Sequence, residues 1–215
     1  MPNNCISTYK IVGEREDIAD LFHKLYTLFE ITSQYRNAYL IAHRDKTPFP
    51  EKPPEVLHGD SHLDLCDIVN YFGGDANEVD CRGFVERFEF EDETTIKIFT
   101  DTAYVPMQRV WATVVANYES LRYYFVSDEI GSECFYNNDT DGACFLDKYF
   151  IDNDFGGENE VADSDKFLID YMMKWLEVGE ITTLSDLDIW LEIFNEEHPN
   201  DTLRYYKYEV PPTHI

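Results

Sequence analysis

The pattern of apolar residues between positions 4 and 128 most strongly limits the fold of this chain. Two segments in this stretch carry apolar residues at helical spacing, one after Gly13 and one beginning at Pro106. Four segments have the alternation, or the β-branched and aromatic content, of half-buried strands: CISTYKIV, GFVERFEF, TTIKIFT and SLRYYFVS. The predicted order is therefore strand, helix, strand, strand, helix, strand.

This order is the split βαβ arrangement of ferredoxin-like folds, so we predict an α+β protein with a ferredoxin-like sheet. The core would span residues 4–128, with a helical insertion at residues 32–75. That insertion contains RDKTPFPEKPPEVLHGD, an irregular stretch with four prolines, and then a short helix capped by Ser61. The sequence has no internal repeat and no strong break in composition, so we expect a single domain over residues 1–215.

The extension at residues 129–215 is predicted to add a β-hairpin and two helices. The hairpin would cover residues 134–151 and turn at Asp141-Gly142, because Asp and Gly tolerate the positive φ of such turns. We expect the helices to pack against the same sheet as the rest of the chain. They are predicted from about Asp165 to Val178 and from about Ser185 to Asn195, before a last strand in LRYYKYEV.

The loop FYNNDTDGACFLDKYFIDND, residues 135–154, partly matches the calcium loop of an EF-hand. Lys148 occupies the twelfth position counted from Asn137, where calcium needs a bidentate carboxylate. The flanking segments also favour strands, whereas an EF-hand needs helices. These features exclude an EF-hand but leave a looser calcium site open. Its candidate ligands are Asp139, Asp141, Asp152 and Asp154.

The cysteines and the N-terminus predict a cytoplasmic protein. The N-terminus has no basic and apolar leader, and no apolar run is long enough to span a bilayer. The five cysteines are scattered and form no C-x-x-C pair, which predicts free thiols in a reducing compartment. They are Cys5, Cys66, Cys81, Cys134 and Cys144.

The negative charge is the strongest signal in the composition. The formal net charge is −26, and it is uneven. Residues 1–60 hold 9 acidic and 7 basic residues, whereas residues 128–170 hold 13 acidic residues and only two lysines, Lys148 and Lys166. Such a surface repels nucleic acids and anionic membranes and attracts basic proteins or cations.

Neither catalysis nor RNA binding is indicated by the motifs. The chain has no glycine-rich phosphate loop, no nucleophile elbow and no Cys/His signature, so we predict no cofactor and no catalytic residue. RGFVERFEF begins like an RNA-recognition signature, but Val85 replaces the required Gly or Ala and Glu86 replaces an apolar residue. We expect Phe84, Phe88 and Phe90 to share one strand face in the core.

Several short motifs resemble the YubB-type ferredoxin-like proteins of plasmids and other mobile elements. They are MPNNC, GGD followed by VDCRG, YYFVSDEIG, YNNDTDG and DKYFID, within residues 1–152. The family often opens Met-Pro-Asn-Trp-Cys, and here Asn4 stands in place of the tryptophan. The resemblance implies a ferredoxin-like fold, but no activity and no catalytic residue.

These observations support three hypotheses about function. The leading one is a non-enzymatic protein-binding module whose acidic face meets a basic protein partner, although the charge could also serve solubility alone. The second is a calcium-binding acidic loop. The third is a DNA mimic that occupies a basic nucleic-acid-binding protein, which fits the charge and the resemblance to mobile-element proteins.

Overall fold

The computed structural model describes residues 4–45, 62–154 and 158–212. The chain divides into two compact units, one of residues 1–134 with 212–215 and one of residues 135–211. The boundary lies close to the predicted end of the core at residue 128. The organisation as a single domain stays a prediction.

The first unit is built on a six-stranded antiparallel sheet. The boundary between the two units falls within the last strand of this sheet. The strand order is β2-β3-β4-β1-β5-β6, so β1 pairs with both β4 and β5. A short 3-10 helix at Ile130–Ser132 follows β5. The strands are β1 (Asn4–Val12), β2 (Leu63–Asp64), β3 (Gly83–Asp92), β4 (Thr95–Ala103), β5 (Arg122–Glu129) and β6 (Cys134–Asn137). All four strands predicted between residues 4 and 128 are therefore present.

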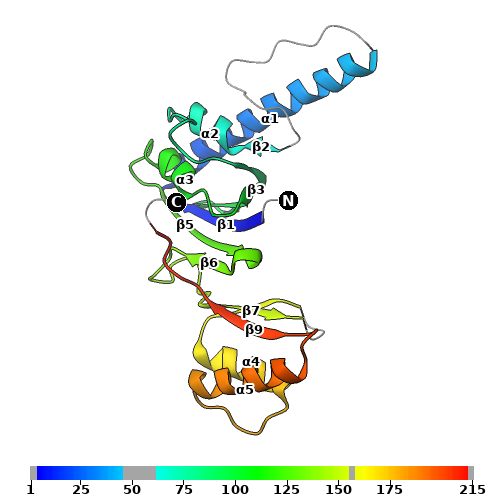
Figure 1. The fold of residues 1–215 in the computed structure, drawn as a ribbon. Coiled ribbons are helices and arrows are strands. Elements are labelled where there is room, and N and C mark those ends of the chain that lie inside the picture. Colours follow the sequence, from blue (N-terminus) through cyan, green and yellow to red (C-terminus); the bar gives the residue numbers. More distant parts are fainter. Residues whose placement is uncertain (1–3, 46–61, 155–157, 213–215) are drawn as a thin grey trace. The chain divides into compact units, whose positions relative to one another are not determined.

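Helices α1 (Arg15–Asp45), α2 (Leu65–Tyr71) and α3 (Gln108–Val115) lie with this sheet in the first unit (Figure 1). On α3, Trp111 is fully buried, and its ring centroid lies 5.3 Å from that of Tyr9 on β1. On α1, Phe22 stacks on Phe90 of β3 at 3.9 Å. Both predicted helices are confirmed, but α3 begins at Gln108 and not at the predicted Pro106. Helix α1 continues past residue 32, where the insertion was expected to start. Most of the proline-rich stretch, residues 46–60, and the predicted cap Ser61 lie outside the described residues.

A β-bulge in β3 overturns the expectation that Phe84, Phe88 and Phe90 share one face. The register with β4 shifts between Val85 and Arg87. As a result, Phe84 pairs with Asp101 while Phe88 pairs with Ile98, and directly paired residues point to the same side of a sheet. The extra residue of a bulge exchanges the two faces. Phe90 is also 48% exposed, so it does not belong to the core.

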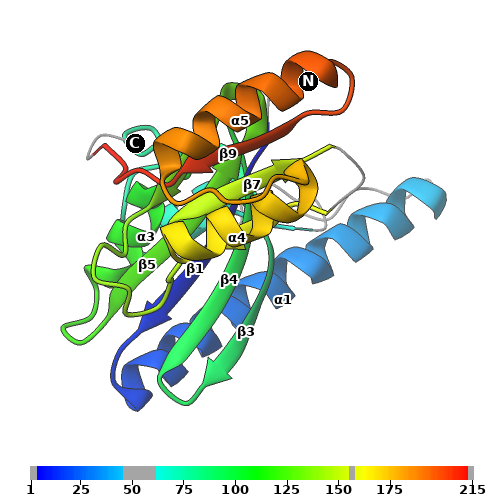
Figure 2. The same cartoon turned by 90° about the horizontal axis from the view of Figure 1, so that it is seen from below.

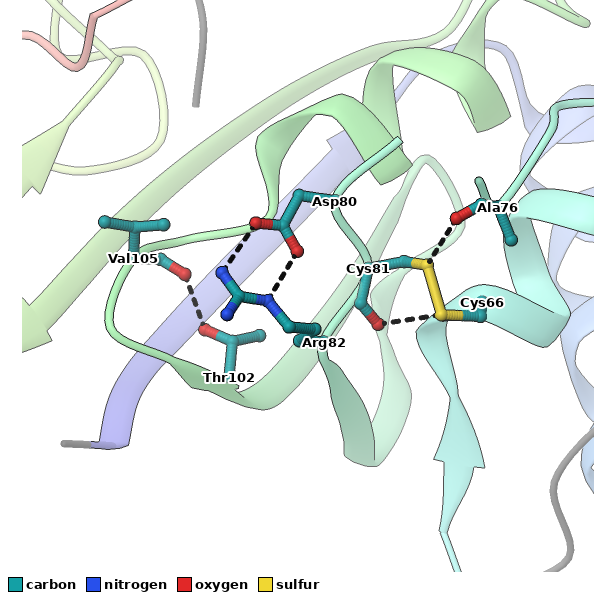
Figure 3. A network of polar contacts seen from close by, with 7 residues as sticks. All are labelled: Cys66, Ala76, Asp80, Cys81, Arg82, Thr102 and Val105. Atoms are coloured by element: carbon teal, nitrogen blue, oxygen red, sulfur yellow. Dashed lines mark hydrogen bonds and ion pairs between the residues drawn. A yellow bond between two sulfur atoms is a disulfide. The ribbon is translucent and has the colours of Figure 1, made fainter. Parts of the chain in front are cut away.

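The start of α2 differs from the prediction in its cap and in its cysteines. Asp64 is the N-cap residue, and its side chain accepts a hydrogen bond from the backbone N–H of Cys66 at 2.8 Å. Cys66 and Cys81 form a disulfide with a Cα–Cα distance of 5.1 Å (Figure 3). The expectation of five free thiols is therefore wrong for these two. The pairing of β2 with β3 brings the two cysteines together. These strands are far enough apart in the sequence that the spacing of the cysteines does not reveal the pairing.

The second unit is a three-stranded sheet with two helices, α4 (Asp165–Leu176) and α5 (Leu184–Glu197), which lie over β7 and β9 in Figure 2. The strand order is β8-β7-β9. The strands are β7 (Tyr149–Asn153), β8 (Glu160–Ala162) and β9 (Leu203–Lys207). The predicted helices and last strand are confirmed.

Two predictions about the second unit are wrong. The hairpin of residues 134–151 does not form, because β6 belongs to the six-stranded sheet and β7 to the three-stranded one. The helices α4 and α5 pack on the three-stranded sheet, whereas they were expected to pack on one sheet shared with the rest of the chain. Their shared core is made by residues such as Tyr149, Ile151, Leu168, Met172, Leu187 and Leu203.

Capping side chains define where the two helices begin. The Ser164 hydroxyl accepts from the N–H of Phe167 at 3.3 Å, and the Thr183 hydroxyl accepts from the N–H of Asp186 at 3.2 Å. Such caps satisfy N–H groups that have no partner within the helix. α4 ends at Leu176, before the predicted end at about Val178, and Glu177 follows it in the left-handed conformation with φ of 52°. In the described part of the chain, no helix has the length and apolar character needed to cross a membrane.

Candidate functional site

Asp139 organises the acidic loop between β6 and β7. Its carboxylate accepts hydrogen bonds from the backbone N–H groups of Ala143, Cys144 and Phe145, at 3.0, 2.5 and 2.8 Å. The residue is only 5% exposed. Burial by itself raises the pKa of Asp139, but these N–H groups favour the charged form more strongly and leave the pKa below its ordinary value. Asp139 therefore holds the loop together as a buried anion.

Asn137 and Gly142 complete this loop. The Asn137 side chain accepts from the N–H of Asp139 at 2.8 Å and donates to the carbonyl of Asp147 at 3.0 Å. Gly142 has φ of 69°, which favours glycine, and its N–H donates to the Asp139 carbonyl at 3.2 Å. A turn forms next to the predicted position, but it spans residues 139–142 with only Gly142 at positive φ, and it belongs to the connection from β6 to β7.

A hollow of about 530 Å³ lies beside this loop. Exposed apolar side chains on its lining include Leu146 and Val210, which are 64% and 65% exposed. Its charged lining residues have both signs, and they are Asp139, Asp141, Asp147, Lys148, Asp163 and Lys207. The hollow is therefore a mixed surface and not a purely acidic one.

The four predicted calcium ligands do not all line this hollow. Asp139 and Asp141 do, whereas Asp152 lies on β7 opposite Arg204 of β9, and Asp154 follows the end of β7. Burial raises the pKa of Asp152, and the like charge of Asp154 adds to the rise, while Arg204 opposes it. Asp154 accepts a hydrogen bond from the Thr202 hydroxyl at 3.3 Å.

The environment of these aspartates gives the calcium hypothesis little support. Three N–H groups already occupy the Asp139 carboxylate, and two ammonium groups on the same lining oppose a bound cation. Among the described residues, no three or more acidic, histidine or cysteine side chains are grouped so that they could hold a metal ion. The calcium site stays a prediction.

The second unit is more densely charged than the first. Residues 135–211 include 19 acidic and 5 basic residues, a net charge of −14. The remaining 138 residues include 24 acidic and 12 basic residues, a net charge of −12. Because the second unit is the smaller one, its charge per residue is about twice as high. The second unit would therefore attract a basic partner more strongly than the first unit would. This attraction would weaken as the salt concentration rises.

The sequence prediction missed an exposed apolar surface on α5. Ile189, Trp190 and Ile193 are 57%, 40% and 42% exposed, and we call these three residues the α5 face. A helix that buries one face needs apolar residues only on that side. The sequence LSDLDIWLEIFNEE carries them on more of its circumference than the buried residues Leu187, Leu191 and Phe194 require. That excess was the available signal.

The last turn of α5 carries charges that oppose its own dipole. Glu196 and Glu197 are exposed there, and that turn has no basic residue. Since carboxylates are unfavourable at the negative end of a helix, Glu196→Lys should raise the free energy of unfolding by roughly 0.5 kcal/mol. Urea unfolding measures it, with the exposed Glu180→Lys outside the helices as the control for net charge. Equal gains in both variants would mean that overall charge, and not the helix end, is responsible.

In the comparison with known proteins, no family model, no curated protein and no solved structure matches this chain. The residues of the loop and of α5 are therefore the basis for any functional argument.

Proposed function

We propose that the chain is a non-enzymatic protein-binding module whose acidic second unit binds a basic protein partner. The observation that carries the proposal is the exposed apolar face of α5 within a unit of 19 acidic and 5 basic residues. A high net charge by itself is explained by solubility as well as by binding. Exposed tryptophan and isoleucine side chains lower solubility, so they are better explained by binding. Aromatic side chains are also enriched where protein interfaces gain most of their energy.

We propose a ferredoxin-like arrangement for the core of the first unit. The order β3-β4-β1-β5 within the antiparallel sheet supports it, together with α1 after β1 and α3 after β4. Membership of the YubB-type family and a cytoplasmic location belong to the same proposal. Neither adds an activity.

The apolar residues on α5 favour an interface with an apolar centre over the DNA-mimic alternative, in which carboxylates would take the place of phosphates in the groove of a basic protein. A mimic needs carboxylates spaced along a surface as phosphates are, about one charge per 1.7 Å of duplex axis. On α5, the acidic residues are interrupted by Ile189, Trp190 and Ile193, all of them exposed. Apolar surface of this kind is typical of an interface with a protein.

A matched pair of charge variants tests the proposal. The first replaces Asp170, Glu192 and Glu196 of the second unit by the corresponding amides. The second replaces Glu78, Glu89 and Glu119 of the first unit by glutamine, and all six residues are exposed. Both variants gain three charge units, so they differ only in where the charge is lost.

We expect the immobilised parent to retain basic proteins from its native host at low salt and to release them at high salt. The second-unit variant should retain much less, while the first-unit variant should behave like the parent. Quantitative mass spectrometry of the eluates measures both. Retention that is independent of salt, or lost equally in the two variants, would contradict binding through the second unit.

A further inference from the structure

The α5 face is exposed while the opposite side of the same helix is firmly buried. Ile189 and Ile193 are one turn apart, and Trp190 lies beside them on the solvent side. Leu187 is completely buried in the core of the second unit. The face therefore lies on the side of the helix that is exposed to solvent, where a partner can reach it.

Acidic side chains bracket this face along the helix axis. Asp186 lies about one turn before it, and Glu196 and Glu197 lie about one turn after it, all of them exposed. Glu192 is exposed at its side. The whole helix Leu184–Glu197 has five acidic residues and no lysine or arginine. A complementary surface must therefore be apolar in the middle and basic at both ends.

The two glutamates at the end of α5 are an independent indication that this charge serves binding. Asp186 is favourable for the helix, because it lies in the first turn and forms a reciprocal pair with the Thr183 cap. Glu196 and Glu197 stand at the opposite, negative end of the helix dipole, where carboxylates destabilise it. Local rules of helix design are commonly broken where a residue has another role.

We infer that the α5 face docks an amphipathic basic helix of a partner protein. This inference rests on the proposed function and names the class of partner and the surface. The apolar stripe of such a helix would cover Trp190 and the two isoleucines, and its lysine or arginine side chains would pair with the acidic residues at the two ends.

A second copy of the chain is a poor occupant of the same face. Two α5 helices packed together would place acidic residues against acidic residues, with no basic side chain on either helix to pair with them. An anionic membrane is disfavoured for the same reason. A basic partner helix meets both the apolar and the charged requirement.

The test uses the full chain and three synthetic helical peptides of equal length. The first has a leucine stripe and a lysine-rich polar face, the second has glutamate in place of lysine, and the third keeps the lysines but has serine in place of leucine. Docking should shift the fluorescence of Trp190 to shorter wavelength, because its indole loses contact with water. Trp190→Phe identifies this signal against Trp111, which is fully buried, and Trp175.

Only the leucine and lysine peptide should bind tightly. The double variant Ile189→Ser with Ile193→Ser should weaken its binding at least about tenfold, since centrally placed apolar contacts dominate interface energies. Leu146→Ser is the matched control, because Leu146 is an exposed apolar residue of the same unit outside α5. It should bind like the parent. Circular dichroism establishes that each variant is folded.

The possible outcomes separate this inference from the proposed function. Equal binding of the leucine and serine peptides, both weakened by salt, would overturn the α5 inference while leaving a basic partner in place. Binding of neither lysine peptide would count against both. Dimerisation of the parent in sedimentation analysis, abolished by the same double variant, would show that a second copy occupies the face and would overturn the inference.

Discussion

Replacing Asp139 by alanine should lower the free energy of unfolding by about 3 kcal/mol, among the largest effects expected for a single residue of the loop. Asp139 is 5% exposed, and its carboxylate accepts hydrogen bonds from the backbone N–H groups of residues 143–145, of which that of Phe145 is buried. The substitution leaves these donors without their acceptor. Urea unfolding measures the loss. Asp141→Ala is the matched control, because Asp141 is exposed on the same loop, and we expect a change of at most about 0.5 kcal/mol.

The effect of Asp139 should depend on pH in a defined direction. Its pKa in the folded chain lies below the ordinary value of 3.8, so its stabilising contribution is complete above that value and is lost as the pH falls through the lower, folded pKa. For Asp139→Asn, the difference from the parent should therefore be largest near neutral pH and should shrink at pH values below 3.8. A difference that stays constant down to acidic pH would mean that the charge of the carboxylate is not what holds the loop.

Removing the disulfide between Cys66 and Cys81 should also cost about 3 kcal/mol, the loop-closure value for a loop of about 15 residues. The bond ties the first turn of α2 to the segment before β3, and without it the unfolded chain gains conformational freedom. The double variant Cys66→Ser with Cys81→Ser should unfold at lower urea concentration. A reductant should lower the stability of the parent to a similar extent and leave the double variant unchanged.

Thiol counting gives an independent check of this bond. Cys5, Cys134 and Cys144 form no disulfide, so denatured protein should react with three equivalents of a thiol reagent before reduction and with five after it. Cys134→Ser is the control, because it removes a free thiol and should leave the effect of the reductant intact. Five reactive thiols in oxidised protein would contradict the bond. Since disulfides are rare in a reducing cytosol, the thiol state in the native host would also test the predicted cytoplasmic location.

Local patterns were sufficient to predict several of the elements that bury one face. The alternation in CISTYKIV places Tyr9 and Ile11 in the core, and both are completely buried in β1. Apolar residues at helical spacing likewise predicted α4 and α5 to within a few residues. In each case the signal lies within a dozen residues, which is the range over which helix and strand periods act.

The predictions that failed depend on which distant segments meet. The hairpin at residues 134–151 looked reasonable because a strand, a turn with glycine and another strand follow one another, yet β6 and β7 pair in different sheets. Strand pairing and register are decided by the burial of whole faces, which no short window contains. The same limit hid the disulfide, whose cysteines are 15 residues apart in the sequence.

The candidate site shows the same division. Composition alone established that residues 128–170 carry an excess of acidic side chains, because charge is additive along a chain. The spacing of Asn137, Asp139 and Asp141 suggested metal ligands, but tertiary structure directed the Asp139 carboxylate to backbone N–H groups. A carboxylate serves equally well for either purpose, so its role depends on which donors the fold brings within reach.

By itself, then, the sequence determined the α+β class, the order of most helices and strands and the acidic character of the chain, since each of these depends on residue type and short-range period. Only the tertiary structure decided that the strands form two sheets, that Cys66 joins Cys81, and that Ile189, Trp190 and Ile193 face solvent. These features depend on which apolar surfaces find a partner within the chain. An apolar residue has the same chemistry in a core and on a surface, and only packing distinguishes the two.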